Sequence, residues 1–231
     1  MKTYYQDESV TIYNAPCEDV LAALPRCSLL LTDPPFGINA ARHRNSQANG
    51  WRDFGTVEES KWDAKPASLE TLTAFVQLAD VSIVWGGNYF GLPPSMGWLV
   101  WDKGQREFSL ADCELAWTSE NRAARVFNMS RSEALQEGKE YPTQKPEALM
   151  RWCIGWSRAD KSRPICDPYC GSGNTLKAAK RLGYRAIGID ASERACEITA
   201  KRMAQESLFS IPDSDAGRGD NNQTQGEFFS A

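Results

Sequence analysis

Short apolar runs alternate with segments of helical periodicity along most of the chain. The runs predict strands at residues 10–13, 28–32, 81–85, 98–101 and 113–117, with two more that begin at Ile165 and Ala186. The segments predict helices at residues 17–24, 69–79, 146–156, 175–182 and 193–206. Strands that alternate with helices indicate a mostly parallel sheet covered on both faces, which is the α/β fold class.

The strand at residues 28–32 runs into Thr32-Asp33-Pro34-Pro35-Phe36-Gly37. Strand ends of open α/β sheets are where ligands bind, and two prolines stiffen this exit because each fixes φ and removes an N–H donor. An acidic acceptor, a free carbonyl and an aromatic plate suit a flat ring that carries an exocyclic NH2 group. Taken alone, the same residues also suit a strand followed by a Pro-Pro turn that Asp33 caps.

A glycine-rich turn follows the strand that begins at Ile165, in the order Asp167-Pro168-Tyr169-Cys170-Gly171-Ser172-Gly173-Asn174-Thr175. A helix comes next, and the strand after it ends in Asp190. This is the pattern of a nucleoside-binding βαβ unit, in which the distal acid takes the ribose hydroxyls. Asp167 would repel a pyrophosphate and attract an ammonium group, which favours S-adenosylmethionine (AdoMet) over NAD.

Together the two motifs resemble those of the DNA amino-methyltransferases, which methylate the exocyclic nitrogen of adenine or cytosine. Residues 141–149, Tyr-Pro-Thr-Gln-Lys-Pro-Glu-Ala-Leu, resemble a third signature of that family. The catalytic motif precedes the AdoMet motif, as in the beta group, and the resemblance runs from about residue 10 to about residue 203. It implies a Rossmann-like methyltransferase sheet, mostly parallel with one antiparallel strand. The small size suits a phage or orphan enzyme.

The resemblance also implies roles for individual residues. In the catalytic motif Asp33, Pro34, Pro35 and Phe36 hold the target: Asp33 and the Pro34 carbonyl accept its amine hydrogens, and Phe36 stacks on the base. Asp167 binds the methionine ammonium, Asp190 holds the ribose, and Thr143 and Lys145 contact the carboxylate end of AdoMet. The other cofactor-binding residues are Tyr169, Gly171, Ser172, Gly173, Asn174 and Thr175.

The first residue of the catalytic motif favours a DNA adenine-N6 methyltransferase, since Asp there is typical of adenine enzymes and Ser of N4-cytosine enzymes. The nearest alternative is an N4-cytosine enzyme of the same fold. An RNA or protein-amide methyltransferase and an inactive AdoMet-binding DNA module are further alternatives. A base inside a duplex cannot reach such a pocket, so the target must be flipped out of double-stranded DNA.

The net charge of −4 is concentrated at the end of the chain, where residues 205–231 hold five acids and one arginine. We expect residues 1–206 to form one catalytic domain and residues 207–231 a disordered acidic tail. Inserted DNA-recognition loops are expected at about 39–65 and 120–140, where arginines cluster. Each cluster could follow a phosphate backbone, although solvated loop charge explains it as well. The six candidates are Arg42, Arg44, Arg52, Arg122, Arg125 and Arg131.

The remaining composition bears on membrane insertion, metal binding and cellular location. The chain has 231 residues, 42% of them hydrophobic, and no apolar run approaches the roughly 20 residues of a membrane span. Its seven cysteines form no CxxC pair and it has one histidine, so we expect reduced thiols and no metal site. We place the enzyme in the cytoplasm of a bacterial or phage-infected cell. A homodimer is predicted only because beta-group relatives are often dimers.

Overall fold

A nine-stranded mixed sheet organises the computed structural model, which describes residues 2–38, 63–106, 111–137 and 144–208. The strand order is β1-β2-β9-β8-β3-β4-β6-β5-β7. The strands are β1 (Tyr5–Gln6), β2 (Val10–Asn14), β3 (Cys27–Thr32), β4 (Ala79–Trp85), β5 (Trp98–Asp102), β6 (Cys113–Thr118), β7 (Arg125–Asn128), β8 (Ile165–Asp167) and β9 (Ala186–Asp190).

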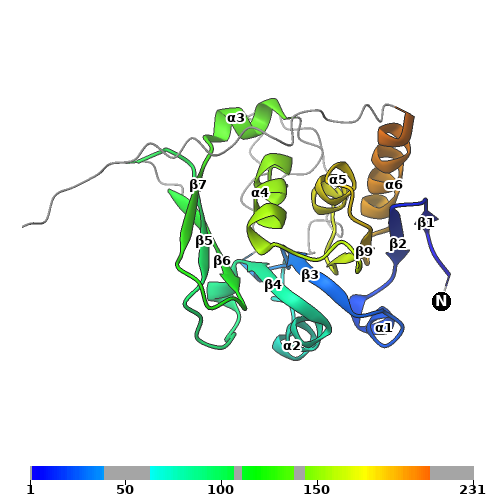
Figure 1. Cartoon of the computed structure of the whole chain (residues 1–231), viewed down its shortest axis with the longest axis horizontal. Helices are drawn as coiled ribbons and strands as arrows, with labels where there is room; N and C mark the ends of the chain where they lie inside the picture. Colours follow the sequence, from blue (N-terminus) through cyan, green and yellow to red (C-terminus); the bar gives the residue numbers. More distant parts are fainter. Residues whose placement is uncertain (1, 39–62, 107–110, 138–143, 209–231) are drawn as a thin grey trace, which may run out of the picture.

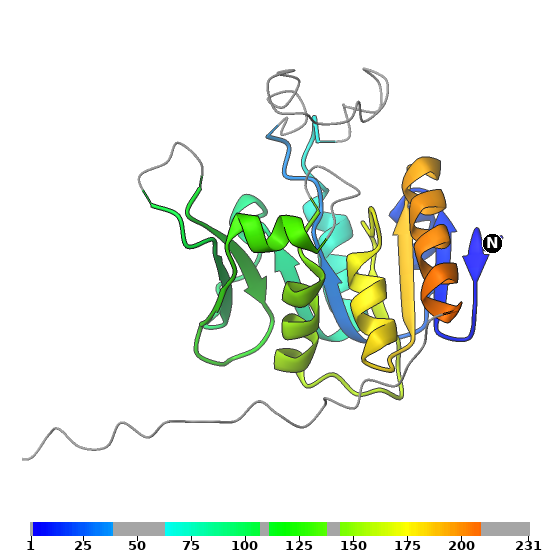
Figure 2. The same cartoon turned by 90° about the horizontal axis from the view of Figure 1, so that it is seen from above.

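Helices cover both faces of the sheet (Figure 1). One face carries α1 (Cys17–Leu21) and α2 (Leu69–Leu78). The other carries α4 (Glu147–Ser157), α5 (Asn174–Arg181) and α6 (Glu193–Leu208), which lie side by side in Figure 2, with α3 (Arg131–Gln136) beyond them. A short 3-10 helix, η4 (Gly87–Tyr89), follows β4. This confirms the predicted Rossmann-like α/β fold.

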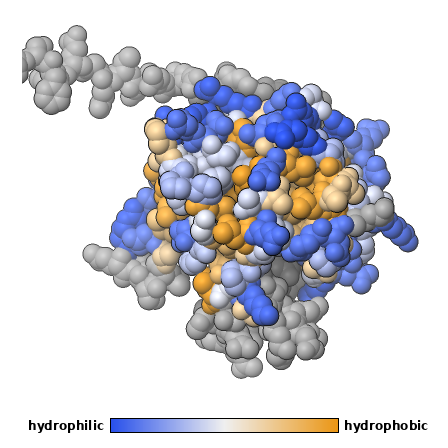
Figure 3. Space-filling model, turned by 90° about the horizontal axis from the view of Figure 1, so that it is seen from below, coloured by the Kyte–Doolittle hydropathy of each residue, from blue (hydrophilic) through white to orange (hydrophobic). Residues whose placement is uncertain are grey.

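Two apolar clusters, one on each side of the sheet, form the core. The central strand β3 is buried at all six positions, and its side chains divide between the clusters: Leu29 and Leu31 join one, and Leu30 joins the other. That period of two is what a strand buried on both faces requires. Seen from the side of α1 and α2, apolar side chains gather at the middle of the molecule with polar ones around them (Figure 3).

The sheet has two antiparallel strands among the described residues, where the sequence predicted one. The expected one is β6, which pairs antiparallel with both β4 and β5. The other is β1, which pairs with β2 from Tyr5 opposite Ile12. It was missed because two residues show no periodicity, and because the turn depends on Asp7, whose carboxylate accepts the backbone N–H groups of Ser9 and Val10.

The predicted recognition loop at 120–140 contains regular structure. The strand β7 closes the sheet beside β5, and α3 follows it. Ser130 and Glu133 form a capping box at the start of α3. Its Ser-x-x-Glu signature was available in the sequence, so this helix could have been predicted. The predicted loop at 39–65 and the predicted tail lie almost wholly outside the described residues.

Candidate active site

The carboxyl ends of four parallel strands meet around one cavity of about 640 Å³. Asp33 follows β3, Asp167 ends β8 and Asp190 ends β9, and all three line the cavity. The parallel register brings β3 and β8 together, with Leu30 opposite Cys166. Two motifs that are far apart in the sequence therefore form one site, at the edge of the sheet where α/β proteins bind ligands.

Asp167 lies at the inner wall of this cavity, 3% exposed. Its Oδ1 accepts hydrogen bonds from the Thr32 hydroxyl at 2.8 Å and from the backbone N–H of Tyr169 at 3.2 Å. Burial raises the pKa of Asp167 to about 6, although these donors and Thr175 act in the opposite direction. A buried carboxylate without a cation suits an ammonium ligand.

Two glycines of the turn after β8 have left-handed backbones, with φ of +52° at Gly171 and +82° at Gly173. A Cβ on Gly173 would lie 2.5 Å from the Thr199 methyl carbon, so this glycine lets α5 pack against α6. A Cβ on Gly171 would meet nothing within 4 Å, and Gly171 lines the cavity. The space beside Gly171 is therefore a cradle into which a ligand fits against bare backbone.

Asp190 supports this turn and faces the same cavity. One carboxylate oxygen accepts the backbone N–H of Gly171 at 2.9 Å, and the other accepts that of Ser192 at 2.8 Å. Burial raises the pKa of Asp190, while these two donors lower it. Each oxygen keeps a lone pair for a further donor, such as a ribose hydroxyl.

Ser172 and Asn174 line the cavity, but their side chains bind other parts of the protein. The Ser172 hydroxyl donates to Gln144 Oε1 at 2.8 Å. The Asn174 amide donates to the Lys145 carbonyl at 2.6 Å, and its oxygen accepts from Arg202 at 2.7 Å. These bonds fix the segment before α4 against α5, so both residues position the third signature beside the AdoMet motif. Tyr169 and Thr175 also line the cavity.

Asp33 also lines the cavity. Its Oδ2 accepts a hydrogen bond from Lys145 Nζ at 2.6 Å. Its Oδ1 is buried and has no hydrogen-bond partner among the described residues. Burial raises the pKa of Asp33, and Lys145 offsets part of that effect. One oxygen of this carboxylate is thus fixed, and the other is an acceptor that awaits a donor.

Lys145 contacts two carboxylates, whereas the sequence assigned it to the carboxylate end of the cofactor. Besides Asp33, its Nζ lies 3.0 Å from Glu114 Oε2 on β6. Glu114 was missed because a single acid on a predicted strand carries no motif. The Lys145–Glu114 pair joins segments that only the sheet topology brings together, so no spacing rule reveals it.

Phe36 is packed against the end of β4. Gly86 permits this, since a Cβ there would lie 2.1 Å from Phe36 Cε1. The Tyr89 ring is stacked on Phe36, with centroids 4.9 Å apart and planes 14° from parallel. Tyr89 is half exposed and was also missed by the sequence analysis.

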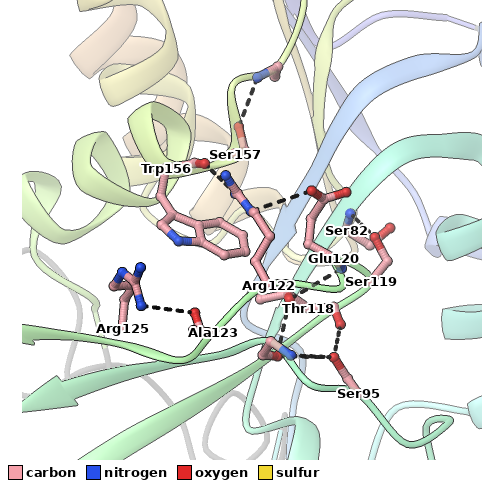
Figure 4. Close-up of polar contacts among 12 residues, drawn as sticks. Ser82, Ser95, Thr118, Ser119, Glu120, Arg122, Ala123, Arg125, Trp156 and Ser157 are labelled. Carbon is pink, nitrogen blue, oxygen red and sulfur yellow. Dashed lines mark hydrogen bonds and ion pairs between the residues drawn. The ribbon is translucent and has the colours of Figure 1, made fainter.

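Among the described residues, the second predicted arginine cluster, Arg122, Arg125 and Arg131, is divided between the two edges of the sheet. Arg122 and Arg125 lie at the amino ends of the parallel strands, since Arg125 pairs with Leu99 at the start of β5, so they are on the edge opposite Asp33. The Arg122 guanidinium lies 3.7 Å from the centroid of the Trp156 ring and donates to the Trp156 carbonyl (Figure 4). Arg122 therefore ties β7 to α4. Arg131, beyond the carboxyl end of β7, lies on the same edge as Asp33. Four predicted site residues lie outside the described residues: Arg42, Arg44, Arg52 and Thr143.

Comparison with known proteins decides the family. A family model described as DNA methylase matches residues 84–201, just over half of the chain. The chain belongs to the DNA methylase family. Its substrate is DNA, its cofactor is AdoMet, and its reaction is that of the amino-methyltransferases acting on adenine N6 or cytosine N4.

Individual relatives of this DNA methylase agree with that assignment. The type II methyltransferase M2.LlaDCHI of Lactococcus lactis subsp. cremoris is 23% identical over 91% of this chain and 95% of its own. M2.DpnII of Streptococcus pneumoniae is 33% identical over 44% of this chain and 45% of its own.

Solved structures share the fold of this DNA methylase. The M1.HpyAVI–SAM complex has a TM-score of 0.56 at 18% identity and covers 84% of this chain and 98% of its own. The PvuII cytosine-N4-specific DNA methyltransferase has a TM-score of 0.57 at 15% identity and covers 87% of this chain and 88% of its own.

Two kinds of feature, a membrane-spanning helix and a metal-binding cluster, are absent from the described residues. Their helices include none that is both long and apolar enough to span a bilayer. They also include no group of three or more His, Cys, Asp or Glu side chains arranged to hold a metal ion. The predicted homodimer stays a prediction.

The raised pKa of Asp167 predicts how AdoMet binding depends on pH. The sequence predicts that Asp167 holds the AdoMet ammonium. Its carboxyl is mostly protonated at about pH 5, because its pKa is raised to about 6, so we expect roughly tenfold weaker AdoMet binding there than at about pH 7.5. The AdoMet-free protein should show the reverse trend. A raised acid pKa removes stability as the pH rises from the ordinary value of 3.8 to about 6.

Calorimetric titration with AdoMet at the two pH values measures the first effect, and thermal unfolding of the free protein measures the second. Asp167→Asn is the control, because it should bind AdoMet weakly and lose both dependences. Equal affinity of the unsubstituted protein at both pH values would contradict the assignment of Asp167 to the ammonium.

Proposed function

We propose that this DNA methylase transfers the methyl group of AdoMet to N6 of an adenine that is flipped out of double-stranded DNA. The observation that carries the proposal is the Asp33 carboxylate, whose Oδ1 is buried, unpartnered and beside the cofactor cavity. An exocyclic amine is the donor that such an oxygen lacks. We also infer that residues 1–206 form one catalytic domain, in the cytoplasm where bacterial or phage DNA is found.

The reacting amine needs help because its lone pair is delocalised into the ring. Asp33 Oδ1 and the Pro34 carbonyl each accept one N–H hydrogen, which draws the nitrogen toward tetrahedral geometry and directs its lone pair at the sulfonium methyl group. AdoMet, when bound, would supply the methyl group for the new N–C bond, and its sulfur would keep the electron pair of the broken C–S bond. The nitrogen then loses one proton to the carboxylate, which passes it to solvent. The protein contributes mainly by positioning and charge.

The cofactor lies on the other side of the cavity in this proposal. Asp167 holds the methionine ammonium, Gly171 gives the close approach and Asp190 holds the ribose. The donor set fits AdoMet because it joins a buried acid, an open backbone cradle and a second acid with free lone pairs. Ser172, Gly173, Asn174 and Thr175 shape the turn around it, and Tyr169 borders it.

The flipped base stacks on Phe36 in this proposal, which requires Tyr89 to move from the ring that it now covers. Tyr89 is half exposed, so its movement sacrifices little buried surface. Arg131 is on the edge where DNA must approach, and Arg42, Arg44 and Arg52 remain candidates for phosphate contacts. Adenine is favoured over cytosine by the Asp at position 33.

Product analysis tests the proposal. The enzyme is incubated with tritiated-methyl AdoMet and unmethylated double-stranded DNA, the DNA is digested, and the labelled nucleoside is identified. We expect N6-methyladenine. Label in N4-methylcytosine would overturn the choice of base, and label in RNA with none in DNA would overturn the choice of nucleic acid. A parallel reaction without enzyme gives the background.

A further inference from the structure

Four charged groups of alternating sign, two of them buried lysines, extend from the Asp33 carboxylate into the protein. Lys145 Nζ lies 2.6 Å from Asp33 and 3.0 Å from Glu114, and Lys103 Nζ lies 2.5 Å from the other oxygen of Glu114. They come from four segments: the exits of β3 and β5, the strand β6 and the chain before α4. We propose that Lys145 is the positioning residue for Asp33, and that Glu114, itself fixed by Lys103, holds Lys145 in place. The inference rests on the proposed function of Asp33.

The burial of the lysines argues for a fixed arrangement. Lys145 is 7% exposed and Lys103 is 4% exposed, so neither ammonium can exchange its carboxylate partners for water. A buried lysine without a partner is costly, and two lysines matched by two carboxylates leave no net charge in the cluster. Glu114 binds both ammonium groups, so it fixes the position of Lys145 relative to the sheet.

The pKa values of Glu114 and Lys145 reflect the same charge balance. Burial alone would raise the pKa of Glu114, but Lys145 and Lys103 lower it to about 2. Burial lowers the pKa of Lys145, and Asp33 and Glu114 raise it above its usual value. Lys145, which binds Asp33, and Glu114, which holds Lys145, are therefore both charged across the working pH range.

The arrangement has two consequences for Asp33. First, Lys145 occupies Oδ2, so the carboxylate cannot rotate freely and Oδ1 alone faces the amine. Second, the adjacent cation lowers the pKa of Asp33, which burial raises, and the ionised form is the stronger acceptor for an amine hydrogen at Oδ1. Lys145 acts through Asp33 in this account and takes no part in binding the cofactor carboxylate.

Two substitutions shift the pKa of Asp33 in opposite directions. Lys145→Met removes the cation and should raise that pKa, whereas Glu114→Gln removes a nearby negative charge and should lower it. The acid limb of kcat, measured at saturating AdoMet and DNA, should therefore move to higher pH in the first variant and to lower pH in the second. If the cluster had only a structural role, the acid limb of kcat would move in the same direction in both variants or would not move in either.

The expected sizes follow from the loss of one charge-assisted hydrogen bond. Lys145→Met should lower kcat roughly 10- to 100-fold at neutral pH, with the Kd of AdoMet unchanged. Lys145→Arg keeps the positive charge and should recover much of the lost kcat. If Lys145→Met does not fold, the arginine variant is measured in its place. Lys161→Met is the matched control, because Lys161 is exposed on the loop before β8, bonds to the Leu182 carbonyl and lies over the Tyr184 ring, outside the charged cluster.

The outcomes separate two failures. If the unsubstituted enzyme methylates DNA and Lys145→Met binds AdoMet much more weakly with an unshifted acid limb, Lys145 belongs to the cofactor site and the inference is overturned. The same holds if Glu114→Gln shifts the limb upward. If the unsubstituted enzyme transfers no methyl group to DNA, the proposed function itself fails.

Discussion

Asp33→Ala is expected to lower the rate of methyl transfer to DNA roughly 10³-fold, while AdoMet binds with unchanged affinity. The unpartnered Oδ1 is the proposed acceptor for the target amine. The other carboxylates that line the cavity are engaged elsewhere, since Asp167 and Asp190 accept hydrogen bonds from the turn after β8 and Glu18 accepts one from Thr71. Single-turnover transfer of tritiated methyl groups measures the rate, and calorimetry measures AdoMet affinity.

Asp33→Asn separates the two features of the carboxylate. The amide keeps the shape and one acceptor oxygen but removes the charge that pairs with Lys145. It should therefore be almost as slow as the alanine variant. Asp80→Asn is the matched control, because Asp80 forms surface ion pairs with Arg26 and Arg163 near the amino end of β4, and such pairs contribute little. Loss of AdoMet binding in Asp33→Ala would mean that the two sides of the cavity are misassigned.

Alanine at Gly173 is expected to destabilise the fold, and alanine at Gly171 to weaken AdoMet binding without unfolding the protein. Both residues have positive φ, so each substitution costs about 1–2 kcal/mol in backbone strain. Only at Gly173 does the new Cβ collide, 2.5 Å from Thr199, which adds about 1–3 kcal/mol. Thermal unfolding should show a much larger fall for Gly173→Ala.

Each glycine variant is the control for the other: Gly171→Ala for the stability effect of Gly173→Ala, and Gly173→Ala for the binding effect of Gly171→Ala. In Gly171→Ala the methyl group enters the open space beside the turn, which the proposal assigns to AdoMet. We expect AdoMet affinity to fall roughly tenfold or more, with a thermal midpoint only a few degrees below that of the unsubstituted protein. Unchanged affinity in Gly171→Ala would show that the cofactor does not approach the backbone at this position.

The parts of the structure that were predictable from the sequence are those with strong local signals. Leu29, Leu30 and Leu31 mark a fully buried strand, and the turn at Gly171 and Gly173 marks the strand-to-helix connection of the AdoMet motif. By contrast β1 and β7 have two and four residues, which is too short for periodicity to distinguish them from loop. The helix α3 was detectable from its capping box.

Within the site, the sequence predicted the residues of each motif but not their partners. Lys145 and Glu114 are 31 positions apart, and nothing local shows that an antiparallel strand places Glu114 beside the exit of β3. The cluster of Arg122, Arg125 and Arg131 is divided between the two edges of the sheet for a related reason. A run of arginines indicates charge, but the direction of β7 decides at which edge of the sheet Arg125 lies, and the ring of Trp156 decides that Arg122 has a packing role.

The pairing of β3 with β8 has a consequence for how the protein is made. Thr32 on β3 bonds to Asp167 at the end of β8, 135 positions later, so the central strand leaves the ribosome long before its neighbour exists. Until then the nascent chain holds an open edge on a largely apolar strand, of the kind that aggregates. The Asp33 carboxylate and the turn at Gly171 are joined through one sheet only after translation has passed β8, so the cavity between them does not exist in a shorter nascent chain.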